Sequence, residues 1–180
     1  MADFRKESES LLYEGRVISV AEGHFVAPGG ERVEREIVHH PGAVSVVPLL
    51  DDQSVVLIRQ YRAALDRVIL EIPAGKRDVA GESAEMTANR ELAEEVGLHA
   101  RRLTKLAEFF NSAGFSDEHS TVFLGTDLEV VPSDLQGVEE QHMTIEHVQL
   151  TATREMIERG EITDAKTIIG LLLALDQRGS

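Results

Sequence analysis

The sequence contains no cysteine, and it has no long hydrophobic run. Without cysteine the chain has no disulfide, no thiolate metal site and no thiol nucleophile, a composition that is typical of a cytoplasmic protein. No segment approaches the roughly 20 apolar residues of a membrane span. The first ten residues, MADFRKESES, are charged and lack an apolar core, so we expect no signal peptide.

Positive charge is also scarce. The 18 lysines and arginines stand against 32 aspartates and glutamates, which gives a net charge of −14. Because there is no basic surface to release counterions, we expect neither nucleic acid nor an anionic membrane as a partner. A small anionic substrate is compatible with this charge if metal ions or local arginines reverse the field at its site. The 180 residues, 42% of them hydrophobic, suffice for one domain with a substantial core.

Acidic residues are concentrated in the segment from Gly75 to Leu98, GKRDVAGESAEMTANRELAEEVGL. If residues 84–96 are helical, Glu91 and Glu95 lie one turn apart on one face of the helix. Like charges at this spacing repel unless a cation lies among them, and carboxylate oxygens suit Mg²⁺ or Mn²⁺. The simpler alternative is an acidic helix face in contact with solvent.

The residues around this helix favour a metal site. Pro73–Gly75 predicts a sharp turn before it, and Gly97 stands where a glycine caps a helix end. The segment resembles the box of the Nudix hydrolases: Gly, five residues, Glu, seven residues, Arg-Glu, an apolar residue, any residue, Glu-Glu, any residue, Gly, an apolar residue. The start departs from this pattern, because Lys76 occupies the glycine position, and we interpret this as a one-residue insertion after Gly75. The matching residues are Glu82, Arg90, Glu91, Leu92, Glu94, Glu95, Gly97 and Leu98.

The resemblance implies a role for each glutamate of the box. Glu91 and Glu95 would bind Mg²⁺, with Mn²⁺ as the alternative, together with the backbone carbonyl of Ala74. Glu94 would share a further ion. Such an ion bridges phosphate oxygens and lowers the pKa of a bound water, which suits hydrolysis of a pyrophosphate.

Two further roles follow from the same resemblance. Glu82 would hold Arg90 and so orient the helix, although a water-mediated contact with the metal is the alternative. A general base must take a proton from the attacking water. In the ADP-ribose pyrophosphatase branch of the family, which residues 15–177 resemble, this base is a glutamate on a loop after the box. We expect Glu139 in this role, with Glu140 next, against the alternative that both glutamates are merely solvated.

The resemblance also indicates the substrate contacts. The arginine after the segment RQY contacts the substrate in this branch, which indicates Arg62, with Arg59 as the less favoured candidate. One position departs from the branch: Ala113 stands where a proline is usual, which leaves other sugar nucleotides such as GDP-mannose open. The remaining candidates come from a glycine-containing loop and from the partner's strands in a dimer: Gly114, Glu118, Arg35 and Glu36.

We therefore predict an α/β fold of the Nudix type, an α/β/α sandwich with a mixed sheet and a small N-terminal antiparallel sheet. Residues 1–42 would form that sheet, exchange it across a homodimer and help to line the substrate pocket, and residues 43–180 would form the catalytic domain. Residues 1–10 are expected to be frayed, with a hairpin at Pro28–Gly30. The other expected elements are an apolar stretch over 43–50, strands over 54–62, 67–72, 103–110, 120–128 and 144–150, a loop over 130–140, and helices over 84–96, 152–159 and 165–177.

The leading hypothesis is a metal-dependent hydrolase that cleaves the pyrophosphate of ADP-ribose, or of a similar nucleoside diphosphate sugar, to AMP and ribose 5-phosphate. The alternatives are a Nudix hydrolase for another sugar nucleotide such as GDP-mannose, a non-catalytic ADP-ribose sensor, and an interaction scaffold built on an acidic helix. The full set of box glutamates argues against the sensor, because a protein that only binds has no need of it.

Overall fold

The computed structural model describes residues 3–135 and 138–178, without the side chain of Glu139. The chain divides into two units. Unit 1 contains the residues up to Gly42 and the segment Phe109–His119, and unit 2 contains Ala43–Glu108 and the residues from Ser120 onward. Residues 109–119, called the loop segment below, therefore group with the N-terminal residues in unit 1, while the residues on either side of them belong to unit 2. Within the described residues, no helix has the length and apolar character needed to cross a membrane.

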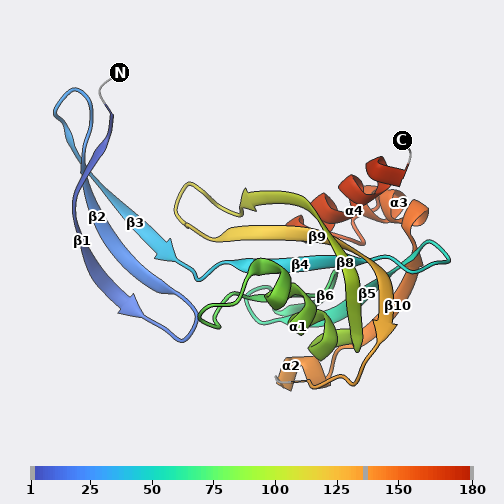
Figure 1. Ribbon diagram of the computed structural model, residues 1–180. Helices are drawn as coiled ribbons and strands as arrows, with labels where there is room; N and C mark the ends of the chain where they lie inside the picture. Colours follow the sequence, from blue (N-terminus) through green and yellow to red (C-terminus); the bar gives the residue numbers. More distant parts are fainter. Residues whose placement is uncertain (1–2, 136–137, 179–180) are drawn as a thin grey trace. The chain divides into compact units, whose positions relative to one another are not determined.

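Unit 1 is built on an antiparallel sheet in the order β1-β2-β3 (Figure 1). Its strands are β1 (Arg5–Glu14), β2 (Ser19–Val26) and β3 (Arg32–His39). The prediction of frayed residues 1–10 is wrong, because β1 begins at Arg5. Every side chain of β1 is exposed, so its sequence carries no burial pattern, and hydrogen bonds to β2 hold it in the sheet.

A histidine joins three parts of unit 1. His39 Nδ1 lies 2.5 Å from Asp117 Oδ2 in the loop segment, and His39 Nε2 lies 3.1 Å from Glu9 Oε1 in β1. Beside it, the N–H of Val38 donates to the carbonyl of Phe115 at 2.8 Å. The hydrogen bond with Asp117, and secondarily that with Glu9, raises the pKa of His39 above its ordinary value, because both carboxylates favour the imidazolium form.

Unit 2 contains two sheets, in the orders β7-β4-β9-β8 and β10-β5-β6 (Figure 1). Strand β4 runs parallel to β9 and antiparallel to β7, so the four-stranded sheet is mixed as predicted. The strands are β4 (Ala43–Pro48), β5 (Ser54–Arg62), β6 (Arg67–Glu71), β7 (Ala74–Lys76), β8 (Leu98–Phe110), β9 (His119–Val130) and β10 (Thr144–Gln149).

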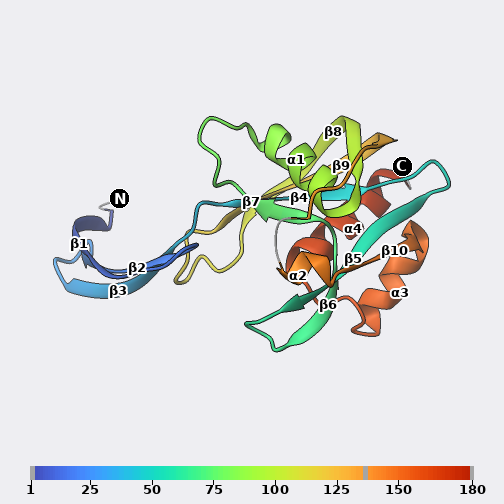
Figure 2. The ribbon, with the colours of Figure 1, turned by 90° about the horizontal axis from the view of Figure 1, so that it is seen from below.

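Helices cover both faces of the mixed sheet (Figure 2). Alternation along β4 directs Val46 into a core with Leu92 of α1 (Ala84–Val96). On the other face, a side chain at Gly170 of α4 (Ala165–Arg178) would meet Val47 within 3 Å, so this glycine lets the helix approach the sheet closely. The predicted α/β/α sandwich is confirmed. The remaining helices are α2 (Val138–Gln141), η1 (Leu150–Ala152) and α3 (Thr153–Glu158).

Three local predictions for unit 2 differ from the structure. The expected loop over 130–140 ends in α2, a single helical turn that is too short to show a periodic pattern. Strand β7 was not predicted, because its three residues read as a turn. Strand β8 begins at Leu98 rather than at residue 103, since its polar start, LHARR, lacks the alternation of a half-buried strand.

We predict that the loop segment 109–119 is held less firmly at alkaline pH. Because the folded pKa of His39 is raised, its contribution to stability is complete below its ordinary value of 6.5 and is lost as the pH rises through the folded value. Backbone amides of residues 112–118, corrected for intrinsic exchange rates, should therefore be better protected at about pH 6 than at about pH 9. The variant His39→Gln should lose this difference, and equal protection of the wild type at both pH values would contradict the prediction.

Candidate functional site

Helix α1 has defined ends, and they place the glutamates on one face. Ser83 caps the N-terminus, where its hydroxyl accepts the N–H of Met86 at 3.2 Å. Gly97 ends the helix in the left-handed conformation, with φ +65°, and its N–H donates to the carbonyl of Ala93 at 3.0 Å. The helix spans the predicted residues 84–96, so Glu91 and Glu95 are separated by one turn as expected.

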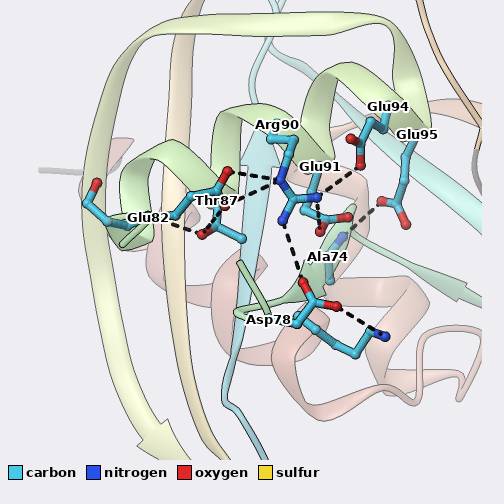
Figure 3. A network of polar contacts seen from close by, with 10 residues as sticks. Ala74, Asp78, Glu82, Thr87, Arg90, Glu91, Glu94 and Glu95 are labelled. Atoms are coloured by element: carbon cyan, nitrogen blue, oxygen red, sulfur yellow. Dashed lines mark hydrogen bonds and ion pairs between the residues drawn. The ribbon is translucent and has the colours of Figure 1, made fainter. Parts of the chain in front are cut away.

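Arg90 is the centre of the polar network on this face (Figure 3). Its Nε lies 3.3 Å from both carboxylate oxygens of Glu82, whose Oε2 also accepts the hydroxyl of Thr87 at 3.1 Å. Its Nη1 donates to Glu91 at 2.8 Å and to Glu94 at 3.1 Å. One guanidinium thus hydrogen-bonds to three carboxylates, and Asp78 lies 4.0 Å from its Nη2, so negative charge is in excess around Arg90.

The buried carboxylate of Glu95 faces the backbone of β7. The N–H of Ala74 donates to Glu95 Oε2 at 3.0 Å, and Glu95 is only 5% exposed. Burial raises the pKa of Glu95 to about 8, against the opposing effect of the Ala74 N–H. Burial also raises the pKa of Glu91, against the charge of Arg90. Both carboxylates therefore lie where a further positive charge would stabilise their ionised forms.

Gly75 brings β7 against the second carboxylate. A Cβ atom at this position would lie 1.8 Å from the Cδ atom of Glu91, so no larger residue fits without displacing that carboxylate. Two successive residues of β7 consequently meet two carboxylates of α1, Ala74 with Glu95 and Gly75 with Glu91. The sequence indicates only a turn at Gly75, because a contact with a distant residue such as Glu91 leaves no local pattern.

The donor set fits a hard divalent cation. Carboxylate oxygens with raised pKa values, next to the backbone of Ala74, are the ligand type that Mg²⁺ and Mn²⁺ prefer. In the arrangement of the described residues, no three His, Asp or Glu side chains already converge as a ligand group. Arg90 contacts Oε1 of Glu91 and the Ala74 N–H contacts Oε2 of Glu95, and each carboxylate has a second oxygen with which it could bind a cation.

Arg62 lies beside this face in an ion pair that the sequence did not reveal. Its Nε and Nη2 donate to the two oxygens of Glu71 at 2.6 and 2.8 Å, and Glu71 is completely buried. Lys166 contacts the same carboxylate. The positive charge of Arg62 acts to lower the pKa of Glu95, so the two residues lie near each other. Glu71 and Lys166 lie in segments that resemble the family, EIPAGK and DAK, but no sequence signal distinguished them from structural residues.

The other candidates of unit 2 have different positions. The side chain of Arg59 pairs with Glu146 across β5 and β10, with Nη2 3.5 Å from Oε2. Glu140 lies in α2, and its charge helps to raise the pKa of Glu95, so the structure brings these two glutamates close together. Glu139 also belongs to α2, but its side chain lies outside the described part of the structure.

The remaining four substrate candidates all belong to unit 1. Arg35 and Glu36 are neighbours on β3, and Arg35 Nη1 donates to a backbone carbonyl of its own strand at 2.7 Å. Gly114 is open to solvent, since an added Cβ would meet no described atom within 4 Å. The N–H of Glu118 donates to the hydroxyl of Ser116 at 3.2 Å, which gives the loop a local turn.

Comparisons with known proteins agree with this geometry. A family model described as a NUDIX domain matches residues 39–168. The ADP-ribose pyrophosphatase of Bacillus subtilis (strain 168) is 40% identical over 160 residues, which cover 89% of this chain and 86% of that protein. The ADP-ribose pyrophosphatase of Mycobacterium tuberculosis (strain ATCC 25618 / H37Rv) is 38% identical over 170 residues, with 94% and 82% covered. A solved ADP compounds hydrolase shares the fold, with a TM-score of 0.83 at 24% identity over 97% of this chain and 94% of that one.

We predict that Gly75→Ala removes cation binding without unfolding the protein. The added methyl group meets the flexible end of Glu91, which can move away, so the melting temperature without metal should change little. Mg²⁺ or Mn²⁺ should raise the melting temperature of the wild type and should raise that of the variant much less. An equal rise in both proteins would contradict a cation site at Glu91. The exposed Gly114→Ala, which meets no described atom within 4 Å, is the matched control.

Proposed function

The chain belongs to the NUDIX domain family, and we propose that it hydrolyses the pyrophosphate of ADP-ribose, or of a similar nucleoside diphosphate sugar. The products from ADP-ribose would be AMP and ribose 5-phosphate. The observation that carries this proposal is the contact of Ala74 and Gly75 with Glu95 and Glu91, which provides a buried carboxylate pair beside Arg62. Two relatives at 38–40% identity bear the name ADP-ribose pyrophosphatase, which supports the choice of substrate.

In this proposal Glu91, Glu95 and the carbonyl of Ala74 hold Mg²⁺, with Mn²⁺ as a possible replacement, and Glu94 contributes to a further ion. When bound, the metal would neutralise phosphate charge and make an attacking water more acidic. Arg90 keeps Glu91 and Glu94 oriented on one face, and Glu82 fixes Arg90 in turn. The water-mediated role of Glu82 remains the alternative.

The protein's own residues would bind the substrate and move the proton. The side chain of Arg62 is 38% exposed, and the planar fork of donors in its guanidinium suits a phosphate. A glutamate of α2 would accept the proton from the attacking water. Glu139 remains the first candidate by resemblance. Glu140 is the second candidate, and its position near Glu95 supports it. Arg59, engaged with Glu146, is the weaker candidate for phosphate contact.

We propose that the sugar and the base are recognised by Arg35, Glu36, Gly114 and Glu118. Ala113, at the position where related enzymes usually have proline, keeps GDP-mannose and other sugar nucleotides as alternative substrates. The non-catalytic sensor stays the alternative from another class. We also retain the cytoplasm as the expected location of the protein, which is a prediction from its composition.

We further propose a homodimer with exchanged N-terminal strands. All ten side chains of β1 are exposed, and among them Leu11, Leu12 and Tyr13 are 57–60% exposed. A three-stranded sheet of this kind buries little by itself, and adjacent exposed apolar residues mark an interaction surface. A second copy of the same chain supplies a matching surface by symmetry.

The activity prediction is hydrolysis of ADP-ribose in the presence of Mg²⁺. A panel of sugar nucleotides that includes GDP-mannose should show the highest kcat/KM for ADP-ribose, and reaction in ¹⁸O-water should label a phosphate product. Glu95→Gln should lower kcat by at least about 100-fold, since a metal ligand is lost. Binding of ADP-ribose without turnover of any sugar nucleotide would support the sensor instead.

A separate prediction follows for each of the two glutamates of α2, Glu139 and Glu140. Exchange of the general base for glutamine should reduce kcat by about 10² to 10⁴ with nearly unchanged metal affinity, because only proton transfer is lost. We expect this effect for Glu139→Gln and a smaller one for Glu140→Gln, each measured with saturating Mg²⁺. Unaffected turnover of the first variant would remove Glu139 from the mechanism, and the reverse order of effects would assign the base to Glu140.

Sedimentation velocity at micromolar concentration should show a dimer. The change Leu11→Glu, Tyr13→Glu on the exposed strand β1 should shift the protein toward the monomer, because it places charge on the proposed contact surface. A monomeric wild type would refute the exchanged dimer.

A further inference from the structure

We propose that Glu71 and Lys166 are positioning residues, which hold the guanidinium of Arg62 oriented and positively charged for a substrate phosphate. This inference rests on the proposed function, because it gives Arg62 a phosphate to bind. It concerns two buried charged residues that have no part in the metal site itself.

The first step is the fork between Arg62 and Glu71. Both oxygens of a fully buried carboxylate accept from one guanidinium, through Nε at 2.6 Å and Nη2 at 2.8 Å. Two parallel bonds fix the plane of the guanidinium, which a single bond would leave free to rotate. Among the described residues, the remaining Nη1 has no hydrogen-bond partner, and the side chain is 38% exposed. Glu71 thus immobilises the inner edge of Arg62 and leaves the outer nitrogen for a ligand.

The second step is the anchoring of Glu71 by α4. Lys166 Nζ contacts Glu71 Oε2 and lies 3.0 Å from Asp164 Oδ2. The same Asp164 oxygen accepts the N–H and the hydroxyl of Thr167 at 3.0 and 2.6 Å, so it caps the helix. The Thr167 hydroxyl oxygen in turn accepts the N–H of Ile72 at 3.0 Å, next to Glu71 in the chain. The first turn of α4 is therefore bonded both to the carboxylate and to the backbone that carries it.

The third step is the balance of charge. Glu71 alone would neutralise Arg62, and the pair would attract a phosphate weakly. Lys166, only 15% exposed, supplies a second cation to the same carboxylate and also pairs with Asp164, so the four groups together carry no net charge. Without Lys166 the other three groups, Arg62 included, would carry a net charge of −1, which opposes the approach of an anion.

Stability alone does not account for this arrangement. Buried ion pairs seldom contribute more to stability than well-packed apolar residues of the same volume, because the charges must leave water. Four such groups on β5, β6 and around the start of α4 are better explained by what they do to their most exposed member, which is Arg62.

The test compares Lys166→Gln, Lys166→Arg and the matched control Lys105→Gln. Lys105 makes an exposed ion pair with Glu108 at 3.0 Å, far less shielded from water. Loss of the charge at 166 should raise KM for ADP-ribose roughly tenfold, as expected for one partly screened charge near the ligand, with a much smaller change in kcat. In Lys166→Arg the KM should return to the wild-type value, and in Lys105→Gln the KM should stay at the wild-type value. The dissociation constant of ADP-ribose in metal-free buffer should follow KM.

The outcomes separate a positioning role from a structural one. A lowered melting temperature with unchanged KM and dissociation constant would make Lys166 a residue of stability alone and overturn the inference. Asp164→Asn provides a second test if Lys166→Gln does not fold. It keeps the helix cap and removes a negative charge, so KM should stay the same or fall, and a raised KM would overturn the inference. A wild type that binds ADP-ribose without hydrolysing it would refute the proposed function, while the dissociation constants would still decide the role of Lys166.

Discussion

The contact between β7 and α1 is the constraint on which the rest of the site depends. Two successive residues, Ala74 and Gly75, meet Glu95 and Glu91 on adjacent turns of the helix. A strand advances about 3.3 Å per residue and a helix turn about 5.4 Å, so this match holds only for a short segment. That is consistent with the length of β7, which is three residues. The caps of α1 hold the helix side of this contact in place, and pairing with β4 holds the side of β7.

The parts of the site that could be predicted from the sequence are those with a local signal. The register of the glutamates, the ends of α1 and the pairing of Arg90 with Glu82 follow from spacing and from the resemblance to a known motif. The contact of Gly75 with Glu91 and the burial of Glu71 could not be predicted, because both join segments that are distant in the chain. The first part of strand β1, residues 5–10, was missed for a related reason: its exposed polar residues show no alternation, and only the partner strand reveals them.

The charge distribution reconciles an acidic chain with an anionic substrate. The net charge of −14 opposes the approach of a phosphate from any direction. Near α1 the cations are few but fixed: Arg90 is held by three carboxylates, and Arg62 is held by Glu71. Acidic partners thus determine where the positive groups point, while the glutamates in excess are those suited to bind a metal. A protein of opposite overall charge would attract anions more strongly but less selectively.

The close approach of Gly75 to Glu91 also affects how the family motif should be interpreted. The box contains this glycine as well as the glutamates, and a chain that loses only the glycine still carries every charged residue of the motif. The geometry shows that a single methyl group at Gly75 would compete with the Glu91 carboxylate for its place, with every acidic residue intact. A non-catalytic descendant could therefore arise without any change in the charged motif. Among related sequences, the size of the residue at this position should separate enzymes from binding proteins better than a count of glutamates.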